Sequence, residues 1–227
     1  MKPRVVVPVL MVHPSSKRAT IGAALATLVL VVSGVTSAPS ATLDPATLAA
    51  SKSMEAKLQI LQSNQPSATY PAVIITEREA NSYLKVHSGE FLPPGVSAPS
   101  VSVQPEHAVA SGDVNFDTLS RSYPNPNDWG PKVLAAMFKG TQRVTLTAKI
   151  QSEDSGFRVQ IESIVVGSMT VPNWLVDYFV QNVLQPRYKI DLTKPLPYPD
   201  HVTRIVLGSG QTTFLRGPKV GPPGKGQ

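Results

Sequence analysis

Apolar and polar residues alternate almost without interruption along two segments in the middle of the chain, Val144–Ile150 and Phe157–Val166. A repeat of two residues is typical of a β-strand that buries one face and exposes the other to water. The turn-forming residues Asp154-Ser155-Gly156 separate the two segments. The pattern therefore predicts a long antiparallel hairpin over positions 144–166.

Two further hairpins are predicted from shorter alternating segments. In the first, valines alternate with polar residues on both sides of the turn Pro105-Glu106-His107. In the second, Gly208-Ser209-Gly210 separates two β-type runs near the end of the chain. The strands of these hairpins are expected at 101–103 with 109–114, and at 202–207 with 211–215.

Helix signals occupy the region before these strands. Asp44-Pro45 is a favourable helix start, and a loose apolar stripe predicts a helix over 45–62. The β-type run 72–75 follows and leads into Thr76. Thr76 and Glu79 have the spacing of a capping box, which predicts a second helix over 77–87. Its inner face should carry Ala80, Tyr83 and Leu84.

Two helices are predicted in the second half of the chain. A proline- and asparagine-rich loop at 120–131 precedes a short buried helix, which ends at Gly140. Asn173 is expected to cap a helix from Trp174 to Leu184, and Pro186 to end it. The wide apolar face of that helix is formed by Leu175, Val176, Phe179, Val180 and Val183.

The order of these elements predicts an α+β protein, in which a long curved antiparallel sheet packs against or wraps around several helices. Residues 39–69 are interpreted as a spacer and a helix, and residues 70–215 as a single α+β domain. Residues 216–227 are rich in Gly, Pro and Lys, so a disordered basic tail is expected there.

The N-terminal 38 residues have the layout of an export signal. Lys17 and Arg18 precede the apolar run Ile21–Val35, and small residues follow. This order is typical of a signal peptide with cleavage between 37 and 40. An uncleaved signal anchor is the alternative, because Ala19–Thr36 is just long enough to span a bilayer. Both interpretations predict delivery of the remaining chain outside the cytoplasm, in the periplasm, in the cell envelope or as a secreted protein.

Composition removes several classes of function. The net charge of +6 comes from the two ends of the chain, since residues 39–215 hold 14 basic and 15 acidic residues. Nucleic-acid binding by the folded part is therefore not expected. The chain contains no cysteine, which excludes disulfides, thiol catalysis and zinc–thiolate sites.

No catalytic motif or cofactor-binding motif is found in the sequence. His87, His107 and His201 are isolated from one another, so a metal site is not expected. Asp113 and Asp117 flank an alternating segment and are the best candidates for a hydrolase with two carboxylates, which would require the carboxyls to converge in an open cleft with His107 or another polar group nearby. A solvated strand face explains them equally well, and the prediction is a protein without enzymatic activity or cofactor.

Apolar surface is concentrated on the two helices of the second half. Ordinary core packing explains it, but strands that curl around these helices would also leave an elongated channel for acyl chains. Trp174 and Tyr178 lie four residues apart and are placed at the mouth of such a channel. The candidate lining residues are Met137, Phe138, Trp174, Leu175, Val176, Tyr178, Phe179, Val180 and Val183.

Four short segments resemble a family of bacterial envelope proteins related to YpmS and to the LmeA-like phospholipid-binding proteins. The segments are 75–84, Leu92-Pro93-Pro94-Gly95-Val96, 166–172, and Pro195-Leu196-Pro197-Tyr198 together with 202–207. The resemblance covers about residues 70–215 and implies an extracytoplasmic α+β domain behind a signal or anchor. For the LmeA-like group it also implies lipid binding. The 120–131 loop and the basic tail depart from this pattern.

The leading hypothesis is an exported cell-envelope protein that binds a lipid or other apolar ligand, attached to the membrane if the N-terminal segment is not cleaved. The alternative is an anchored protein–protein interaction module without a ligand channel. Its motivation is the 120–131 loop, with Tyr123 and Trp129, and the basic tail.

Overall fold

The computed structural model describes residues 43–63, 71–122, 136–181, 191–199 and 201–217. The predicted export segment, positions 123–131 of the proline-rich loop, and the C-terminal tail from residue 218 lie outside the described residues. The helices are α2 (Pro45–Gln62), α3 (Glu77–Phe91), α4 (Phe116–Ser122) and α6 (Asn173–Phe179). The strands are β1 (Ala72–Thr76), β2 (Val96–Gln104), β3 (His107–Asn115), β4 (Thr141–Glu153), β5 (Gly156–Val166), β6 (Met169–Thr170), β7 (Leu196–Pro197), β8 (Val202–Gly208) and β9 (Gln211–Arg216).

The strands form two antiparallel sheets. The long sheet has the order β2-β3-β4-β5-β6, with β7 also paired to β5, and the small sheet has the order β1-β9-β8. The predicted α+β class with a long antiparallel sheet beside several helices is confirmed. All three predicted hairpins form, as β2–β3, β4–β5 and β8–β9.

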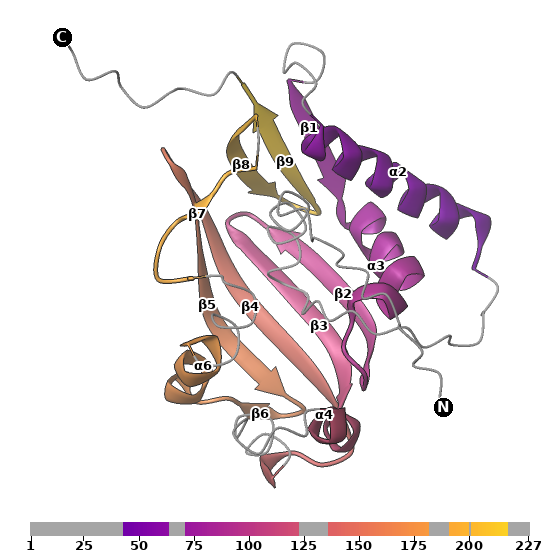
Figure 1. Cartoon of the computed structure of the whole chain (residues 1–227), viewed down its shortest axis with the longest axis vertical. Helices are drawn as coiled ribbons and strands as arrows, with labels where there is room; N and C mark the ends of the chain where they lie inside the picture. Colours follow the sequence, from indigo (N-terminus) through magenta and orange to yellow (C-terminus); the bar gives the residue numbers. More distant parts are fainter. Residues whose placement is uncertain (1–42, 64–70, 123–135, 182–190, 200, 218–227) are drawn as a thin grey trace, which may run out of the picture.

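Helices α2 and α3 lie together beside β1 and β2, whereas α4 and α6 lie at the opposite end of the long sheet (Figure 1). The helix predicted over 45–62 begins and ends as expected, and Asp44 caps it by accepting a hydrogen bond from the Thr47 backbone N–H. The capping box of Thr76 and Glu79 is also present. Helix α3 extends one turn beyond the predicted end, to Phe91, because no proline or capping glycine stops it at residue 87.

Two separate clusters of buried side chains hold the fold together. The larger one joins the small sheet, α2 and α3 to the adjacent end of the long sheet, with Leu61, Ile75, Ala148, Phe157 and Phe214 at its centre. The smaller one lies under α4 and α6. Its buried members are Phe116, Phe138, Val166, Val171, Leu175 and Val176.

Side chains seal the outer edge of β2, which would otherwise expose a row of backbone groups. The Asn81 amide donates to the Val101 carbonyl at 2.8 Å and accepts from the Val101 N–H at 2.7 Å. The Val103 N–H donates to Glu77, and the Val103 carbonyl accepts from the Gly210 N–H at 2.9 Å. Helix α3 therefore occupies the hydrogen-bonding positions that another strand would use.

Two predictions about the second half require correction. Residues 120–122, the first three positions of the predicted 120–131 loop, are helical, since α4 runs to Ser122. Asn173 is the first residue of α6, not its cap, because Pro172 takes that position and makes no side-chain hydrogen bond. Proline at this site pre-sets the backbone for the helix start. Residues 182–184 of the predicted helix lie outside the described residues.

No helix within the described ranges is both long and apolar enough to cross a bilayer.

Candidate functional site

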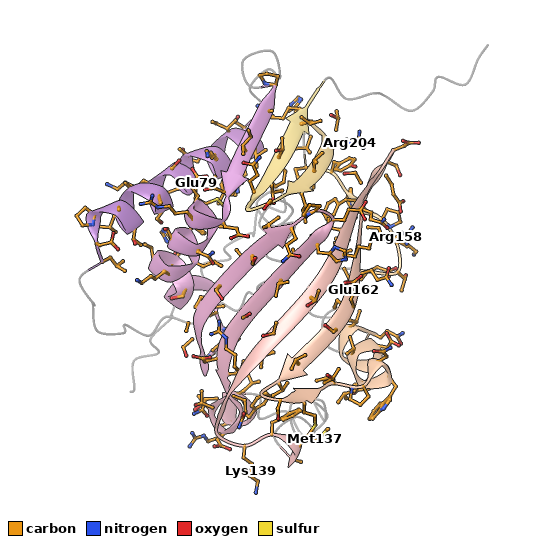
Figure 2. All side chains as sticks on the ribbon, turned by 180° about the vertical axis from the view of Figure 1, so that it is seen from behind. Glu79, Met137, Lys139, Arg158, Glu162 and Arg204 are labelled. Atoms are coloured by element: carbon orange, nitrogen blue, oxygen red, sulfur yellow. The ribbon has the colours of Figure 1, made fainter. Side chains whose placement is uncertain are left out.

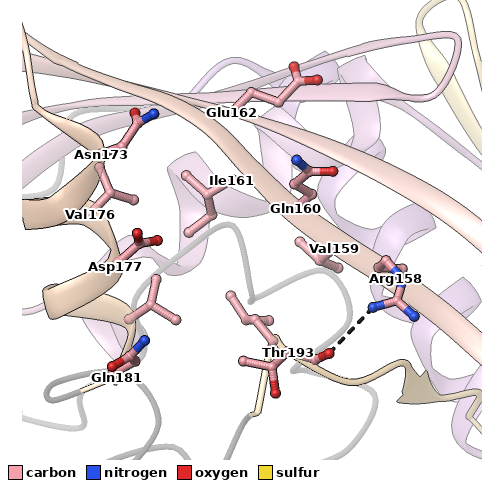
Figure 3. Close-up of a pocket in the computed structure, with 12 residues that line it drawn as sticks. Arg158, Val159, Gln160, Ile161, Glu162, Asn173, Val176, Asp177, Gln181 and Thr193 are labelled. Atoms are coloured by element: carbon pink, nitrogen blue, oxygen red, sulfur yellow. Dashed lines mark hydrogen bonds between the residues drawn. The ribbon is translucent and has the colours of Figure 1, made fainter.

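A cleft of about 630 Å³ lies between the outer edge of β5 and helix α6, and the segment Leu192–Thr193 forms its third side (Figure 3). Strand β5 supplies residues 158–162, and α6 with the turn that follows it supplies Asn173, Val176, Asp177, Val180 and Gln181. The volume is within the range of sites that hold small ligands.

The cleft exists because, within the described residues, the outer side of β5 has neighbouring strands only at its two ends. Strand β7 pairs with Gly156 and Phe157, and β6 pairs with Val165 and Val166. Before β7 the chain turns away from the sheet, because Asp191 accepts hydrogen bonds from Thr193 and its own carbonyl accepts one from Lys194. Positions 158–163 of β5 therefore have no neighbouring strand on this side among the described residues.

Hydrogen-bond directions show which backbone groups of β5 face the cleft. Ile150 of β4 donates its N–H to Glu106, on the side away from β5. Val159 lies opposite Ile150, so its N–H and carbonyl point away from β4 and toward the cleft. Ile161, opposite Ala148, has the same orientation two residues later. Among the described residues no hydrogen bond is found to these outward backbone groups of Val159 and Ile161.

The lining combines an apolar strip with a polar margin. Apolar side chains from three different segments form the strip: Ile161, Val176, Val180 and Leu192. Polar residues that also line the cleft are Arg158, Gln160, Glu162, Asn173, Asp177, Gln181 and Thr193. The site can therefore take a ligand with apolar groups on one side and polar or charged groups on the other.

Charge is distributed unevenly along the cleft. Arg158 lies at the β7 end, where its guanidinium donates to Glu153 at 2.7 Å and to the Thr193 carbonyl at 3.4 Å. Glu162 and Asp177 lie toward the α6 end in Figure 3. Glu162 is 3.3 Å from His107 across the sheet. Arg158 is thus paired with Glu153, and the Glu162 carboxylate faces His107.

The predicted lining residues whose side chains the structure describes fall into three groups. Val176 and Val180 line the cleft, and Val176 also belongs to the smaller core cluster. Phe138 and Leu175 are buried in that cluster, and Tyr178 packs against it. Met137 and Trp174 are exposed, with 64% of the Trp174 surface accessible. The side chain of Phe179 and the whole of Val183 lie outside the described residues.

Met137 contradicts the prediction of a buried helix before Gly140. It is 43% exposed, whereas its neighbour Phe138 is 6% exposed and packs against Phe116 with ring centroids 5.2 Å apart. One apolar side chain is enough to close the smaller core here, so Met137 is left outside. Residues 133–135 of that predicted helix lie outside the described residues.

The two candidate carboxylates of a hydrolase have structural partners. Asp113 forms an ion pair with Arg143 at 3.1 Å, and Asp117 accepts a hydrogen bond from the Gly140 N–H at 3.1 Å. His107 stands at the other end of β3, six residues from Asp113, which corresponds to about 20 Å along a strand. His107 therefore lies far from Asp113 along β3, and neither aspartate lines the cleft.

The most strongly perturbed carboxyl lies far from the cleft. Burial opposes the ionisation of Glu79, but hydrogen bonds from Lys57, Ser53 and Thr76 outweigh it and lower the pKa of this carboxyl to about 2. These contacts fix α2 to the start of α3, as Figure 2 shows for the position of Glu79. Glu79 is therefore part of the structural framework, which explains its pKa without a catalytic role.

Two important features of the cleft were not predicted from the sequence. Ile161 was assigned to a strand without a functional role, and Leu192 was not assigned to any element. The available signal was Pro195 and Pro197, because prolines limit a strand to a short edge segment and so leave part of β5 uncovered. Within the described residues, no group of three His, Asp or Glu side chains is placed to hold a metal ion.

Comparison with known proteins does not identify a family for this chain. No family model matches it, and a search of curated proteins found no significant match.

Proposed function

We propose that the chain is an exported protein of the cell envelope that binds an apolar ligand in the cleft between β5 and α6 and does not catalyse a reaction on it. The strip of Ile161, Val176, Val180 and Leu192 carries this proposal. Four apolar side chains from three segments converge on one open site, and a bound ligand would remove them from water.

A lipid is the ligand expected from the sequence. Its acyl chain would lie on the apolar strip, and its polar head would meet the charged margin formed by Arg158, Glu162 and Asp177. The predicted export segment supports this proposal, because it would direct the chain to the cell envelope, where lipids are available. An uncleaved segment would also keep the protein attached to the membrane.

Native mass spectrometry of the full chain purified from its own envelope tests the proposal. Wild-type protein should carry a non-covalent ligand, and Val180→Trp should lose it, because the larger side chain fills the cleft. Val206→Trp is the matched control, since Val206 is exposed on the small sheet, away from the cleft. An apo mass for the wild type, or equal ligand content in all three proteins, would contradict the proposal.

A protein partner is the second candidate, and one observation favours it. The outward backbone groups of Val159 and Ile161 face the same cleft, and they match the hydrogen-bonding groups of another polypeptide.

A further inference from the structure

We propose that the ligand of this cleft is an extended polypeptide segment that adds to β5 as an antiparallel strand between β7 and β6. The inference rests on the binding cleft of the proposed function and develops its second candidate, a protein partner, in place of a lipid. In this inference the ligand is recognised by the open edge of β5 as well as by the apolar strip.

The backbone of β5 supplies the first argument. Val159 lines the cleft and its side chain is buried in the larger core, while its outward N–H and carbonyl have no hydrogen-bond partner among the described residues. Unpaired backbone groups along a strand edge are a template for pairing with another chain. An acyl chain in the cleft would cover these groups without bonding them, which is unfavourable. A polypeptide strand would cover and bond them together.

The space between the flanking strands fits one strand. Positions 158–163 separate the β7 pairing at Phe157 from the Val171 N–H, which donates to the Ile164 carbonyl at 2.8 Å. This gap corresponds to about six residues, or roughly 20 Å, of extended chain. Both flanking strands run antiparallel to β5. An inserted strand with the same direction would pair at Val159 and Ile161, up to the β-bulge that leaves Glu162 without an opposite residue in β4.

The three walls of the cleft restrict the ligand to a narrow segment. Helix α6 stands on one side and Leu192–Thr193 on the other, so the edge of β5 is recessed between them (Figure 3). A single extended chain can enter this recess, whereas the edge of a second sheet is too broad. The recess therefore selects a peptide over edge-to-edge pairing with a whole domain.

Side chains of the cleft define the sequence that would bind. Alternate residues of an added strand would lie on Val176, Val180 and Leu192 and should be apolar, while those between them face water. A strand antiparallel to β5 would have its N-terminal end near Glu162 and Asp177. We therefore expect the peptide to begin with a basic residue and to continue with alternating apolar and polar residues.

Hydrogen exchange tests the open edge directly in the full-length protein. The amides of Arg158 and Gln160 face β4 and should exchange slowly, whereas those of Val159 and Ile161 should exchange rapidly in the free protein. A bound peptide should slow the second pair and leave the first unchanged. If Val159 and Ile161 are already as protected as Arg158 and Gln160 in the free protein, the edge is occupied and the inference is overturned.

Backbone methylation separates a peptide strand from a ligand held only by its side chains. The probe is the tightest-binding member of a displayed library of eight-residue peptides, selected on the full chain and synthesised in three forms. One form is unmodified, and the other two carry N-methyl groups on the odd or on the even residues. We expect one methylated form to lose about fivefold or more in affinity. Equal affinity of all three forms, or a library without any binder, overturns strand addition.

Ile161→Pro provides the same test on the protein. Proline removes only the amide hydrogen that faces the cleft, and edge strands tolerate it there. Ile161→Ala is the matched control, because it removes the same side chain and keeps that hydrogen. Ile161→Pro should weaken peptide binding about fivefold or more relative to Ile161→Ala. If the proline variant does not fold, the methylated peptides still decide the question.

Phospholipid distinguishes a failure of this inference from a failure of the proposed function. The probe is vesicles of phosphatidylethanolamine and phosphatidylglycerol, with bound lipid measured by native mass spectrometry. If wild type retains lipid, Val180→Trp loses it and no peptide binds, strand addition is overturned and the proposed function stands. If neither peptide nor lipid responds to Val180→Trp, both are overturned. Peptide binding that Val180→Trp and Ile161→Pro both weaken supports the inference.

Discussion

Single side chains connect parts of this fold that are distant in the sequence. Glu79 closes the capping box of α3 and at the same time binds Ser53 and Lys57 of α2. Asn81, two residues later, binds the edge of β2. Ser152 of β4 accepts a hydrogen bond from the Ile205 N–H at 3.0 Å and thereby ties the long sheet to β8. These polar contacts therefore help to hold the helices and the small sheet in position, in addition to the two apolar cores.

The low pKa of Glu79 predicts a loss of stability in acid. The pKa of this carboxyl falls from the model-compound value of 4.5 to about 2 in the folded protein. Its contribution is therefore complete above pH 4.5 and disappears as the pH falls through about 2. The shift means that ionised Glu79 contributes on the order of 3 kcal/mol to the free energy of unfolding at neutral pH.

Urea denaturation of wild type and Glu79→Gln between pH 2 and pH 7 checks this prediction. The glutamine keeps the shape of the side chain and removes its charge. The variant should be less stable than wild type at pH 7, and the difference should vanish toward pH 2. A difference that is independent of pH would show that the charge of Glu79 does not stabilise the fold.

Among the elements, α6 has two roles on two faces. Leu175 and Val176 close the smaller core, while Val176 and Val180 line the cleft. Substitutions on the two faces should therefore act on different properties of the protein.

Leu175→Ala should lower the free energy of unfolding by about 2–5 kcal/mol, because Leu175 is 3% exposed and the lost side chain leaves a cavity. Val180→Trp should change stability by about 1 kcal/mol or less, since Val180 is only partly buried and borders open space. Thermal melts of both variants, with ligand content measured on the same samples, check this division. A larger loss for Val180→Trp would place Val180 in the closed core.

Strand β7 depends on a single aromatic residue that follows it. The Tyr198 hydroxyl donates to the Glu153 carbonyl at 2.8 Å, and its ring lies 6.0 Å from that of Phe157. Tyr198→Phe keeps the ring contact and removes the hydrogen bond. We expect a loss of about 1 kcal/mol in urea denaturation, with faster amide exchange at Phe157. Unchanged amide exchange at Phe157 would show that the Tyr198 hydroxyl does not hold β7 in place.

Local signals in the sequence were sufficient for most elements but not for their pairing. The Thr76–Glu79 capping box and the turn Gly208-Ser209-Gly210 each act within a few residues, so the elements that they define were predicted. The pairing of β5 with β7 joins Phe157 to Leu196, which lies 39 positions further along the chain. Two-residue strands such as β6 and β7 have no periodicity to detect. The open edge of β5, and with it the cleft, therefore required the structure.

At the scale of the whole molecule, two cores share one long sheet. The larger core lies at the end that α2, α3 and the small sheet cover, and the smaller core lies at the end of α4 and α6 (Figure 1). Strands β4 and β5 extend through both, since Ala148 and Phe157 belong to the larger core and Val166 to the smaller. The cleft borders both cores, since Val159 and Leu192 of its lining belong to or pack against the larger core and Val176 belongs to the smaller.

Because Asn81 covers the backbone at the edge of β2, it limits the self-association of this protein. Because α3 covers the outer edge of β2 at Val101 and Val103, and the recess admits only a narrow segment to β5, neither of these edges can pair with a second copy. Asn81→Ala would expose the Val101 backbone. Two copies could then pair through their β2 edges, and because both contribute the same surface, the association would close into a symmetric dimer. Analytical ultracentrifugation should show a monomer for wild type and a monomer–dimer equilibrium for the variant, and a variant that stays monomeric at high concentration would mean that α3 still covers β2 without its amide.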